Sequence, residues 1–192
     1  MKILNINEVR GRKIQLSNYT HIRAYHACRA ENEDIFRTQG LKPYTKDEAL
    51  AVAIRKLENQ RTSKEAIEAK FHELWEERIS ARVWLMPETT ELLSTSGHYL
   101  IYGSEFINAL AMHLGCRERL KEIGTPMIIT CNVPIADMSP CWLSELEQDI
   151  KSGNTANRSI AVNKIVPENI CDIIYPTGYI RDPYLCSFFK LG

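Results

Sequence analysis

The clearest change of hydrophobic pattern along the chain lies at Gly103. A short apolar run over residues 98–102 contains two tyrosines and predicts a strand or an extended segment. From Phe106 onward, apolar residues recur at the spacing of one helix face, and Ser104 is well placed as the N-cap. Gly115 ends this predicted helix. The pattern therefore predicts a strand, a tight turn and a helix.

The turn at Gly103 has two interpretations. The positive end of the following helix lies beside a glycine and two tyrosines, which suits a phosphate-bearing or anionic ligand. Alternatively, this is an ordinary capped helix whose neighbouring tyrosines pack into the core. The hydrophobic pattern leaves both interpretations open.

Strand signals dominate both ends of the chain. The segment over residues 21–30 reads as a mixed apolar strand, and it carries His26 and Arg29 beside small residues that let a ligand approach the backbone. The alternative is a half-buried strand with two solvent-facing polar side chains. The apolar run over 126–133 predicts a buried strand. Shorter strands are predicted over residues 2–6, 13–16, 81–86, 159–166 and 173–175.

Helical patterns occupy the middle of the chain. Two capping-box signatures, which start at Thr45 and Thr62, open a helical segment over about residues 45–80, either as core support or as a partner-binding insert. With strands at both ends and helices between them, the predicted fold class is α+β, in one domain over residues 1–192. Shorter helices are predicted over 34–39 and 142–150, and residues 88–97 form a polar stretch that ends in a loop over 94–97.

Composition narrows the function classes. The formal net charge of the 192 residues is zero, so the chain lacks the broad positive charge of a duplex-binding protein, although a local basic groove stays open. Six cysteines occur without a C-x-x-C pair, which predicts reduced thiols rather than a disulfide frame or a zinc site. No apolar run reaches membrane-spanning length, so we expect a cytoplasmic protein with no membrane segment.

Several common catalytic signatures are absent from the sequence. It contains no phosphate-binding G-x-x-x-x-G-K-[ST] loop, no G-x-G-x-x-G after a strand, no H-E-x-x-H helix and no G-x-S-x-G elbow. Cys28, two residues after His26, is a conceivable nucleophile because alternate residues of a strand share a face. No histidines are paired at ligand spacing, so we expect no metal site.

Four segments in order along the chain resemble the ADP-ribosyltransferases. A strand ends in Tyr25-His26-Ala27-Cys28-Arg29, and a short helix ends in Gln39-Gly40-Leu41. Tyr99-Leu100-Ile101-Tyr102-Gly103-Ser104 then enters a helix, and a late strand ends in Ile165-Val166-Pro167-Glu168-Asn169-Ile170. The resemblance is to the branch with a histidine on the first core strand and a tyrosine before a later helix, which includes poly(ADP-ribose) polymerases, RNA 2′-phosphotransferases and bacterial DNA-modifying toxins. It implies two short packed sheets, with the helical segment inserted after the first core strands.

The resemblance also implies roles for individual residues. His26 would hold the nicotinamide-side ribose of NAD, and the backbone around Ala27 would bind the carboxamide. Tyr102 would stack on the nicotinamide. The implied cofactor-binding set is Tyr25, His26, Ala27, Arg29, Tyr99, Tyr102, Gly103 and Ser104, with Arg29 as the candidate for the diphosphate. NAD would be a substrate, and no metal is implied.

The chain departs from this family at one carboxylate. Most such transferases carry a glutamate at the start of the late strand, but here that strand begins Asn157-Arg158-Ser159-Ile160. Glu105, at the helix start beside Tyr102, is the preferred substitute, which gives the candidate catalytic set His26, Tyr102 and Glu105. Glu168 is a second candidate, and catalysis without a carboxylate is a third possibility. A carboxylate at the start of a helix is equally well explained by the helix dipole.

The function that the resemblance implies is transfer of ADP-ribose from NAD to a macromolecule, by a bacterial toxin or phage-defence effector. The acceptor is a nucleic acid, with single-stranded RNA or DNA as one option, or a protein. An antitoxin or chaperone is a further candidate partner. The alternative is a non-catalytic nucleotide- or protein-binding module on the same fold, with the helices over 45–80 as its interaction surface.

Overall fold

The computed structural model describes residues 1–76, 82–154 and 158–192. Over these residues the fold is mixed α and β with small sheets, which agrees with the predicted α+β class. Three parts of the predictions lie outside the described residues: the end of the 45–80 helical segment, the first residue of the 81–86 strand, and Asn157.

The main sheet is built around two long antiparallel strands. β2 (His21–Ala30) pairs with β4 (Thr125–Pro134) along their whole lengths, which confirms both predicted strands. Among the described residues, β1 (Ile3–Leu4) adds in parallel to β2, and β6 (Ile170–Ile174) adds antiparallel to β4. β4 is almost continuously buried because other elements cover both of its faces.

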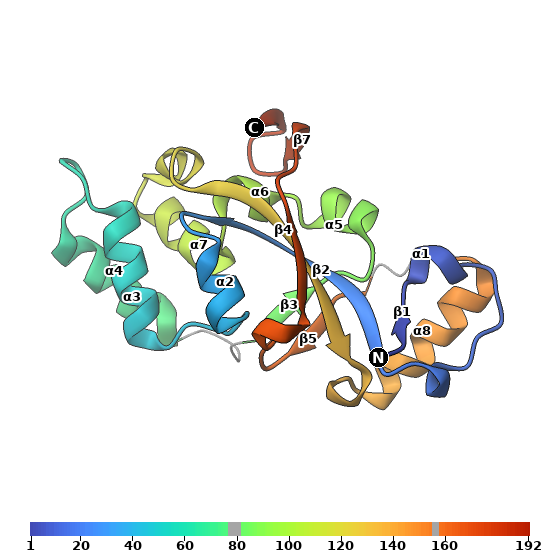
Figure 1. The fold of residues 1–192 in the computed structure, drawn as a ribbon. Coiled ribbons are helices and arrows are strands. Elements are labelled where there is room, and N and C mark those ends of the chain that lie inside the picture. The colour runs from blue at the N-terminus through green and yellow to red at the C-terminus, as the bar shows by residue number, and fades with distance from the viewer. Residues whose placement is uncertain (77–81, 155–157) are drawn as a thin grey trace.

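Two smaller strand pairs accompany this sheet. β3 (Val83–Leu85) pairs antiparallel with β5 (Ile160–Val162). At the C-terminus, β7 (Gly178–Asp182) and β8 (Ser187–Leu191) form a hairpin. Figure 1 shows β7 above the middle of the β2–β4 ladder, near α6.

Helices flank the long ladder at its two ends (Figure 1). α3 and α4 lie at one end, and α1 and α8 lie at the other. The α-helices are α1 (Ile6–Val9), α2 (Asp34–Gln39), α3 (Lys46–Leu57), α4 (Lys64–Glu76), α5 (Thr89–Thr95), α6 (His98–Tyr102), α7 (Glu105–His113) and α8 (Pro140–Ser152). Short 3₁₀ helices are η1 (Leu16–Asn18), η2 (Arg117–Lys121), η3 (Ile135–Asp137) and η4 (Pro167–Asn169).

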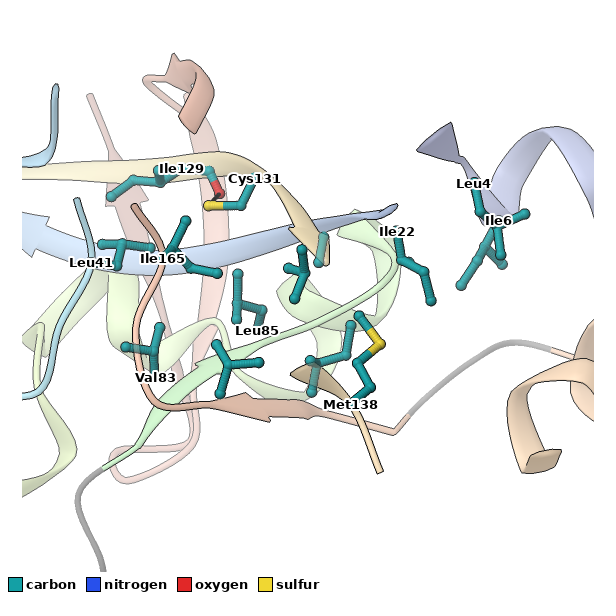
Figure 2. Close-up of a cluster of buried hydrophobic side chains, with 14 of the residues drawn as sticks. Leu4, Ile6, Ile22, Leu41, Val83, Leu85, Ile129, Cys131, Met138 and Ile165 are labelled. Atoms are coloured by element: carbon teal, nitrogen blue, oxygen red, sulfur yellow. Dashed lines mark hydrogen bonds between the residues drawn. The ribbon is translucent and has the colours of Figure 1, made fainter. Parts of the chain in front are cut away.

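The side chains of β2 divide the hydrophobic core into two clusters, because successive residues of a strand point to opposite faces. Ile22 and Ala24 belong to the first cluster, with β3, β5 and α8, and Figure 2 shows Leu85 of β3 within it. Ala27 belongs to the second cluster, which contains α3, α4, α6 and α7. We call these the first and second clusters below.

Helix capping is confirmed at two of the three predicted positions. Thr45 and Glu48 form the complete capping box of α3, and the Ser104 side chain accepts from the backbone amide of Ile107 at the start of α7. The second capping box is wrong. The Ser63 hydroxyl, not that of Thr62, accepts from the Ala66 amide at the start of α4.

Short apolar runs account for most of the wrong predictions. The predicted strand over 98–102 is the helix α6, which buries three consecutive residues and so has no alternation. The polar stretch over 88–97 contains α5, which buries only Leu92 and therefore looks polar, and α5 includes the first two residues of the loop predicted over 94–97. The predicted strand over 2–6 pairs only at Ile3–Leu4, because Asn5 starts α1.

Three further predictions over the strands are wrong in extent or type. The 13–16 segment leads into η1 and forms no strand. Of the 159–166 segment only Ile160–Val162 pairs as β5, and Ile165 instead forms an isolated bridge with Leu41. The C-terminal hairpin was not predicted, because its turn at residues 183–186 contains no glycine or asparagine to mark it.

Gly40 and Gly11 offer a matched test of the close packing of α2 against the segment after β5. Both have positive φ, +74° and +73°, but a Cβ at Gly40 would collide with the Ile165 carbonyl oxygen whereas one at Gly11 meets nothing within 4 Å. We expect Gly11→Ala to lower the free energy of unfolding by about 1–2 kcal/mol, the cost of the left-handed backbone. Gly40→Ala should cost about 1–3 kcal/mol more because of the collision. Urea denaturation of both variants measures the difference, and equal losses would contradict the packing.

Candidate functional site

The candidate site lies where β3 separates from β2. The Tyr25 amide donates to the Met86 carbonyl at 2.8 Å and the Met86 amide donates back at 2.8 Å, so the two strands pair there. Continuing this antiparallel register would place Ala27 opposite Trp84. The described residues show no such pair, and Trp84 pairs with Ala161 of β5 on the other side of β3. The strands therefore separate one residue pair after Tyr25 and Met86.

The pairing at Tyr25 also fixes the direction of the Ala27 backbone groups. In an antiparallel ladder, alternate residues of a strand direct their N–H and C=O toward the same edge. Tyr25 uses both groups toward Met86, so those of Ala27 also point away from β4, toward β3. In the described residues, no ladder or bridge places a residue opposite Ala27 on the β3 side.

Ala27 is nevertheless almost completely buried, with an exposed fraction of 3%. A buried backbone group without a partner costs free energy comparable to a lost hydrogen bond, and such groups are rare. A ligand or water that bound the Ala27 N–H and C=O at this strand edge would avoid that cost.

His26 spans the point of separation. Its Nδ1 lies 2.8 Å from the Trp84 carbonyl oxygen, the acceptor that a continued ladder would have given to the Ala27 amide. A carbonyl only accepts, so Nδ1 carries the proton and donates. Burial lowers the pKa of His26, outweighing the opposite effect of this hydrogen bond. The ring is therefore neutral near pH 7, and its Nε2 is left as an acceptor.

Trp84 was not predicted as a site residue. Val83 and Leu85 point into the first cluster, whereas the Trp84 side chain is 53% exposed. In the folded strand, the exposed Trp84 alternates with the buried Val83 and Leu85. All three residues are apolar, so the only signal in the sequence is that neighbouring residues of a strand point to opposite faces. Its indole offers a large flat face from the same residue whose carbonyl positions His26.

The structure does not bring Tyr102 onto the same face of β2 as His26. Ala27 packs in the second cluster with Tyr102, and the next residue back along the strand, His26, points to the opposite face. Tyr102 is 2% exposed, and its hydroxyl donates to Asp182 at 2.5 Å. Burial, followed by this hydrogen bond, raises the pKa of Tyr102. Its enclosed ring offers no open face for stacking.

Asp182 joins this buried hydrogen bond to the C-terminal hairpin. Its exposed fraction is 0%, and Lys121 lies 3.5 Å from the carboxylate oxygen that Tyr102 contacts. Burial alone would raise the pKa of Asp182, but the hydrogen bonds from Tyr102 and from the Tyr184 and Leu185 amides, with Lys121, lower it on balance. The carboxylate is therefore ionised and holds the hairpin on α6.

Glu105 lies in a separate polar cluster at the start of α7. His98 Nε2 donates to its Oε2 at 2.9 Å, and the Tyr184 hydroxyl donates to its Oε1 at 3.3 Å. The hydrogen bond from His98 lowers the pKa of Glu105. Tyr99 lies against the His98 ring at 4.2 Å, and burial, followed by the charge of Glu105, raises the pKa of Tyr99 to about 12. This carboxylate is ionised and already partnered within the protein.

Arg29 is held by backbone carbonyls. Its guanidinium donates to the carbonyl oxygens of Ile123 at 3.0 Å, Leu100 at 3.3 Å and Lys121 at 2.5 Å. Gly103 passes close to it, because a Cβ there would lie 3.3 Å from the Arg29 carbonyl oxygen. Arg29 therefore fastens α6 and η2 to the end of β2, which accounts for its donors without a diphosphate.

The predicted site residues thus separate into two groups. Tyr25, His26 and Ala27 meet Trp84 where the strands separate, whereas Tyr99, Tyr102, Ser104 and Glu105 surround the start of α7, with Arg29 and Gly103 in the packing beside them. Burial raises the pKa of Cys28 to about 12, which leaves its thiol protonated and unsuited as a nucleophile.

Two kinds of feature are absent from the described ranges: a side-chain group that could hold a metal ion and a helix that could cross a membrane. There, no group of three or more histidine, cysteine, aspartate or glutamate side chains is placed to hold a metal ion. No described helix is long and apolar enough to cross a membrane. No protein-family model matches the chain, and no curated protein matches it either.

The Tyr102–Asp182 contact predicts a measurable loss of stability. We expect Tyr102→Phe to lower the free energy of unfolding by about 1–3 kcal/mol, because the buried Asp182 carboxylate loses a donor while its charge stays enclosed. Tyr44→Phe is the matched control, since the Tyr44 side chain is 42% exposed and its hydroxyl forms no hydrogen bond in the part of the chain that the structure describes. Equal urea denaturation midpoints for the two variants would contradict this assignment.

Proposed function

We propose that this protein is an NAD-dependent ADP-ribosyltransferase whose nicotinamide site lies where β3 separates from β2. The observation that carries the proposal is the edge of β2 at Ala27, which has no ladder partner on the β3 side, next to a histidine whose tautomer is set by the Trp84 carbonyl. Each of these groups matches one feature of the nicotinamide half of NAD.

The Ala27 peptide complements a primary carboxamide. The carboxamide of nicotinamide carries one carbonyl acceptor and an NH₂ donor on the same carbon. The Ala27 N–H would donate to that carbonyl, and the Ala27 C=O would accept from the NH₂. This pairing satisfies two buried backbone groups at once, and it discriminates against a carboxylate, which has no donor for the Ala27 C=O.

His26 complements the adjoining ribose. Its Nε2 is an acceptor, so it would bind a ribose hydroxyl and orient the sugar relative to the ring held by Ala27. Its lowered pKa also favours the reaction electrostatically. Departure of nicotinamide leaves positive charge on the ribose, and a neutral imidazole does not oppose that charge as an imidazolium would.

The exposed Trp84 indole replaces Tyr102 as the stacking group in this proposal. A flat cationic pyridinium is attracted to the face of an aromatic ring, and tryptophan is the most favourable ring for this contact. Tyr102 is enclosed, whereas the Trp84 indole is exposed and belongs to the residue whose carbonyl accepts from His26. Stacking there would hold the nicotinamide against the Ala27 edge and shield the reacting bond from water.

The proposed reaction transfers ADP-ribose from nicotinamide to an acceptor. The bond between the nicotinamide nitrogen and ribose C1′ breaks, and nicotinamide leaves with both electrons. A nucleophilic oxygen or nitrogen of the acceptor forms the new bond to C1′ and gives up its proton. The protein contributes positioning of the ring and ribose, which supplies part of the rate enhancement by avoiding the entropy cost of bringing the groups together.

A carboxylate has no assigned part in this mechanism. Arg158 and Ser159 precede β5, and Glu105 is bound to His98 and Tyr184 in the other cluster. Glu168 lies in η4 between β5 and β6. The missing carboxylate is the specific observation that favours the second candidate function, a module that binds NAD or a related nucleotide without transferring ADP-ribose.

We also propose a biological role for this activity. A transferase of this kind would act as a toxin or phage-defence effector on a nucleic acid or protein, and an antitoxin or chaperone would restrain it. Nothing in the geometry of the nicotinamide site selects among these acceptors, since the site described above binds only the leaving half of NAD.

Two histidines of β2 give a matched test of the transferase. We expect His26→Ala to lower the rate of nicotinamide release from NAD by at least about 100-fold, because the ribose loses its orienting group. His21→Ala should leave that rate unchanged, since His21 lies at the start of the strand, where its ring nitrogen contacts the Thr20 hydroxyl. Labelled NAD is incubated with separate pools of single-stranded RNA, DNA and cell-extract protein, and released nicotinamide and transferred label are both measured.

Circular dichroism melting separates the chemical role from a structural one. Both variants should melt within a few degrees of the unaltered protein, so loss of activity together with loss of folding in His26→Ala alone would make His26 a core residue. Binding of NAD without nicotinamide release in any pool would replace the transferase with the binding module.

A further inference from the structure

We propose that the outer face of the C-terminal hairpin is a platform for single-stranded nucleic acid. The face consists of Tyr179 and Arg181 on β7 with Phe188 and Lys190 on β8, and we call it the hairpin platform. The proposal deepens the proposed function by naming the acceptor class, and it rests on that function only for the transfer step.

The inner and outer faces of the hairpin differ sharply. Ile180, Asp182 and Leu191 point inward and are 6%, 0% and 3% exposed. The outward aromatic side chains, Tyr179 and Phe188, are each 72% exposed. Large aromatic side chains at such exposure on an otherwise well-anchored element mark an interaction surface.

The cross-strand register alternates aromatic and cationic side chains. Arg181 lies directly opposite Phe188, and Tyr179 lies directly opposite Lys190. The two aromatic residues are therefore diagonal neighbours, about 7–8 Å apart, and each has a cation beside it. The outward positions of β7 and β8 carry no acidic residue, and neither Arg181 nor Lys190 forms an ion pair in the described part of the chain.

This arrangement complements a single strand of nucleic acid better than other partners. Unpaired bases stack on aromatic faces while the neighbouring cations bind the phosphates between them. A duplex keeps its bases stacked inside and cannot use Tyr179 or Phe188. A membrane surface would favour a continuous apolar patch, but here aliphatic side chains are absent from the four positions and each aromatic ring stands beside a charge.

The platform is held rigidly on the body of the protein. The Asp182 carboxylate receives the Tyr102 hydroxyl, and Ile180 packs in the second cluster with α6 and α7. Lys121 also approaches the Phe189 ring on the inner side, at 5.8 Å from its centre. A preorganised surface loses little conformational entropy when it binds, so two stacked bases and two phosphates give useful affinity.

Fluorescence anisotropy without NAD tests the platform directly. The probes are labelled RNA and DNA single strands of about 12 nucleotides, within the usual site size, and a duplex of the same length. We expect the full chain to bind the single strands at least about tenfold more tightly than the duplex. The double variant Tyr179→Ala/Phe188→Ala should bind them at least about tenfold more weakly, because two stacking faces are lost.

Arg181 and Lys190 are tested separately, through the salt dependence of the affinity. In Arg181→Gln/Lys190→Gln, the slope of log affinity against log salt should fall by about 1.4, since two phosphate contacts are lost from a single strand. Tyr44→Ala and Lys13→Gln, at exposed positions in other parts of the chain, are the matched controls and should alter neither quantity. Circular dichroism melting checks that every variant is folded.

The outcomes distinguish the platform from the transferase. Failure of the unaltered protein to bind single strands, or unchanged binding by the Tyr179→Ala/Phe188→Ala variant, would overturn the platform. Binding to vesicles of anionic lipid but not to oligonucleotides would also overturn it, in favour of a membrane surface. Oligonucleotide binding through these residues without nicotinamide release from NAD would leave the platform standing and remove the proposed function.

Discussion

The separation of β3 from β2 is the constraint on which the rest of the site depends. The Tyr25–Met86 pair brings the two strands together, and the β3–β5 pair then draws Trp84 away from Ala27. His26 takes the carbonyl that Ala27 would otherwise have used. This short interruption of a ladder leaves a strand edge without a ladder partner at Ala27 and a fixed imidazole at the neighbouring His26.

The surrounding structure offsets the cost of leaving this strand edge without a ladder partner. The two hydrophobic clusters hold β2 from both faces, and Arg29 ties the end of the strand to α6 and η2 through three carbonyls. The second polar cluster, around Asp182, fixes the C-terminal hairpin rather than a ligand. We therefore propose that nicotinamide binds at the edge of β2 and that a separate surface on the hairpin binds an acceptor strand.

Prediction from the sequence succeeded where long patterns specify an element. The buried run of β4 and the Ser104 cap of α7 each leave an unambiguous pattern. Prediction failed for α6, because five apolar residues show no period, and the enclosed position of Tyr102 follows from the hairpin that the sequence analysis missed. Trp84 was missed because its importance comes from strand separation, a long-range property of the fold.

The most direct test of the account follows the Ala27 amide by NMR, as its ¹H–¹⁵N signal, during titration with nicotinamide and with nicotinic acid. These two ligands differ in the single group that Ala27 is proposed to read. The account predicts that nicotinamide shifts the Ala27 signal in a saturable way, whereas nicotinic acid, which has no N–H for the Ala27 carbonyl, does not. An unshifted Ala27 signal, or equal shifts with both ligands, would contradict the assignment of this edge as the nicotinamide site.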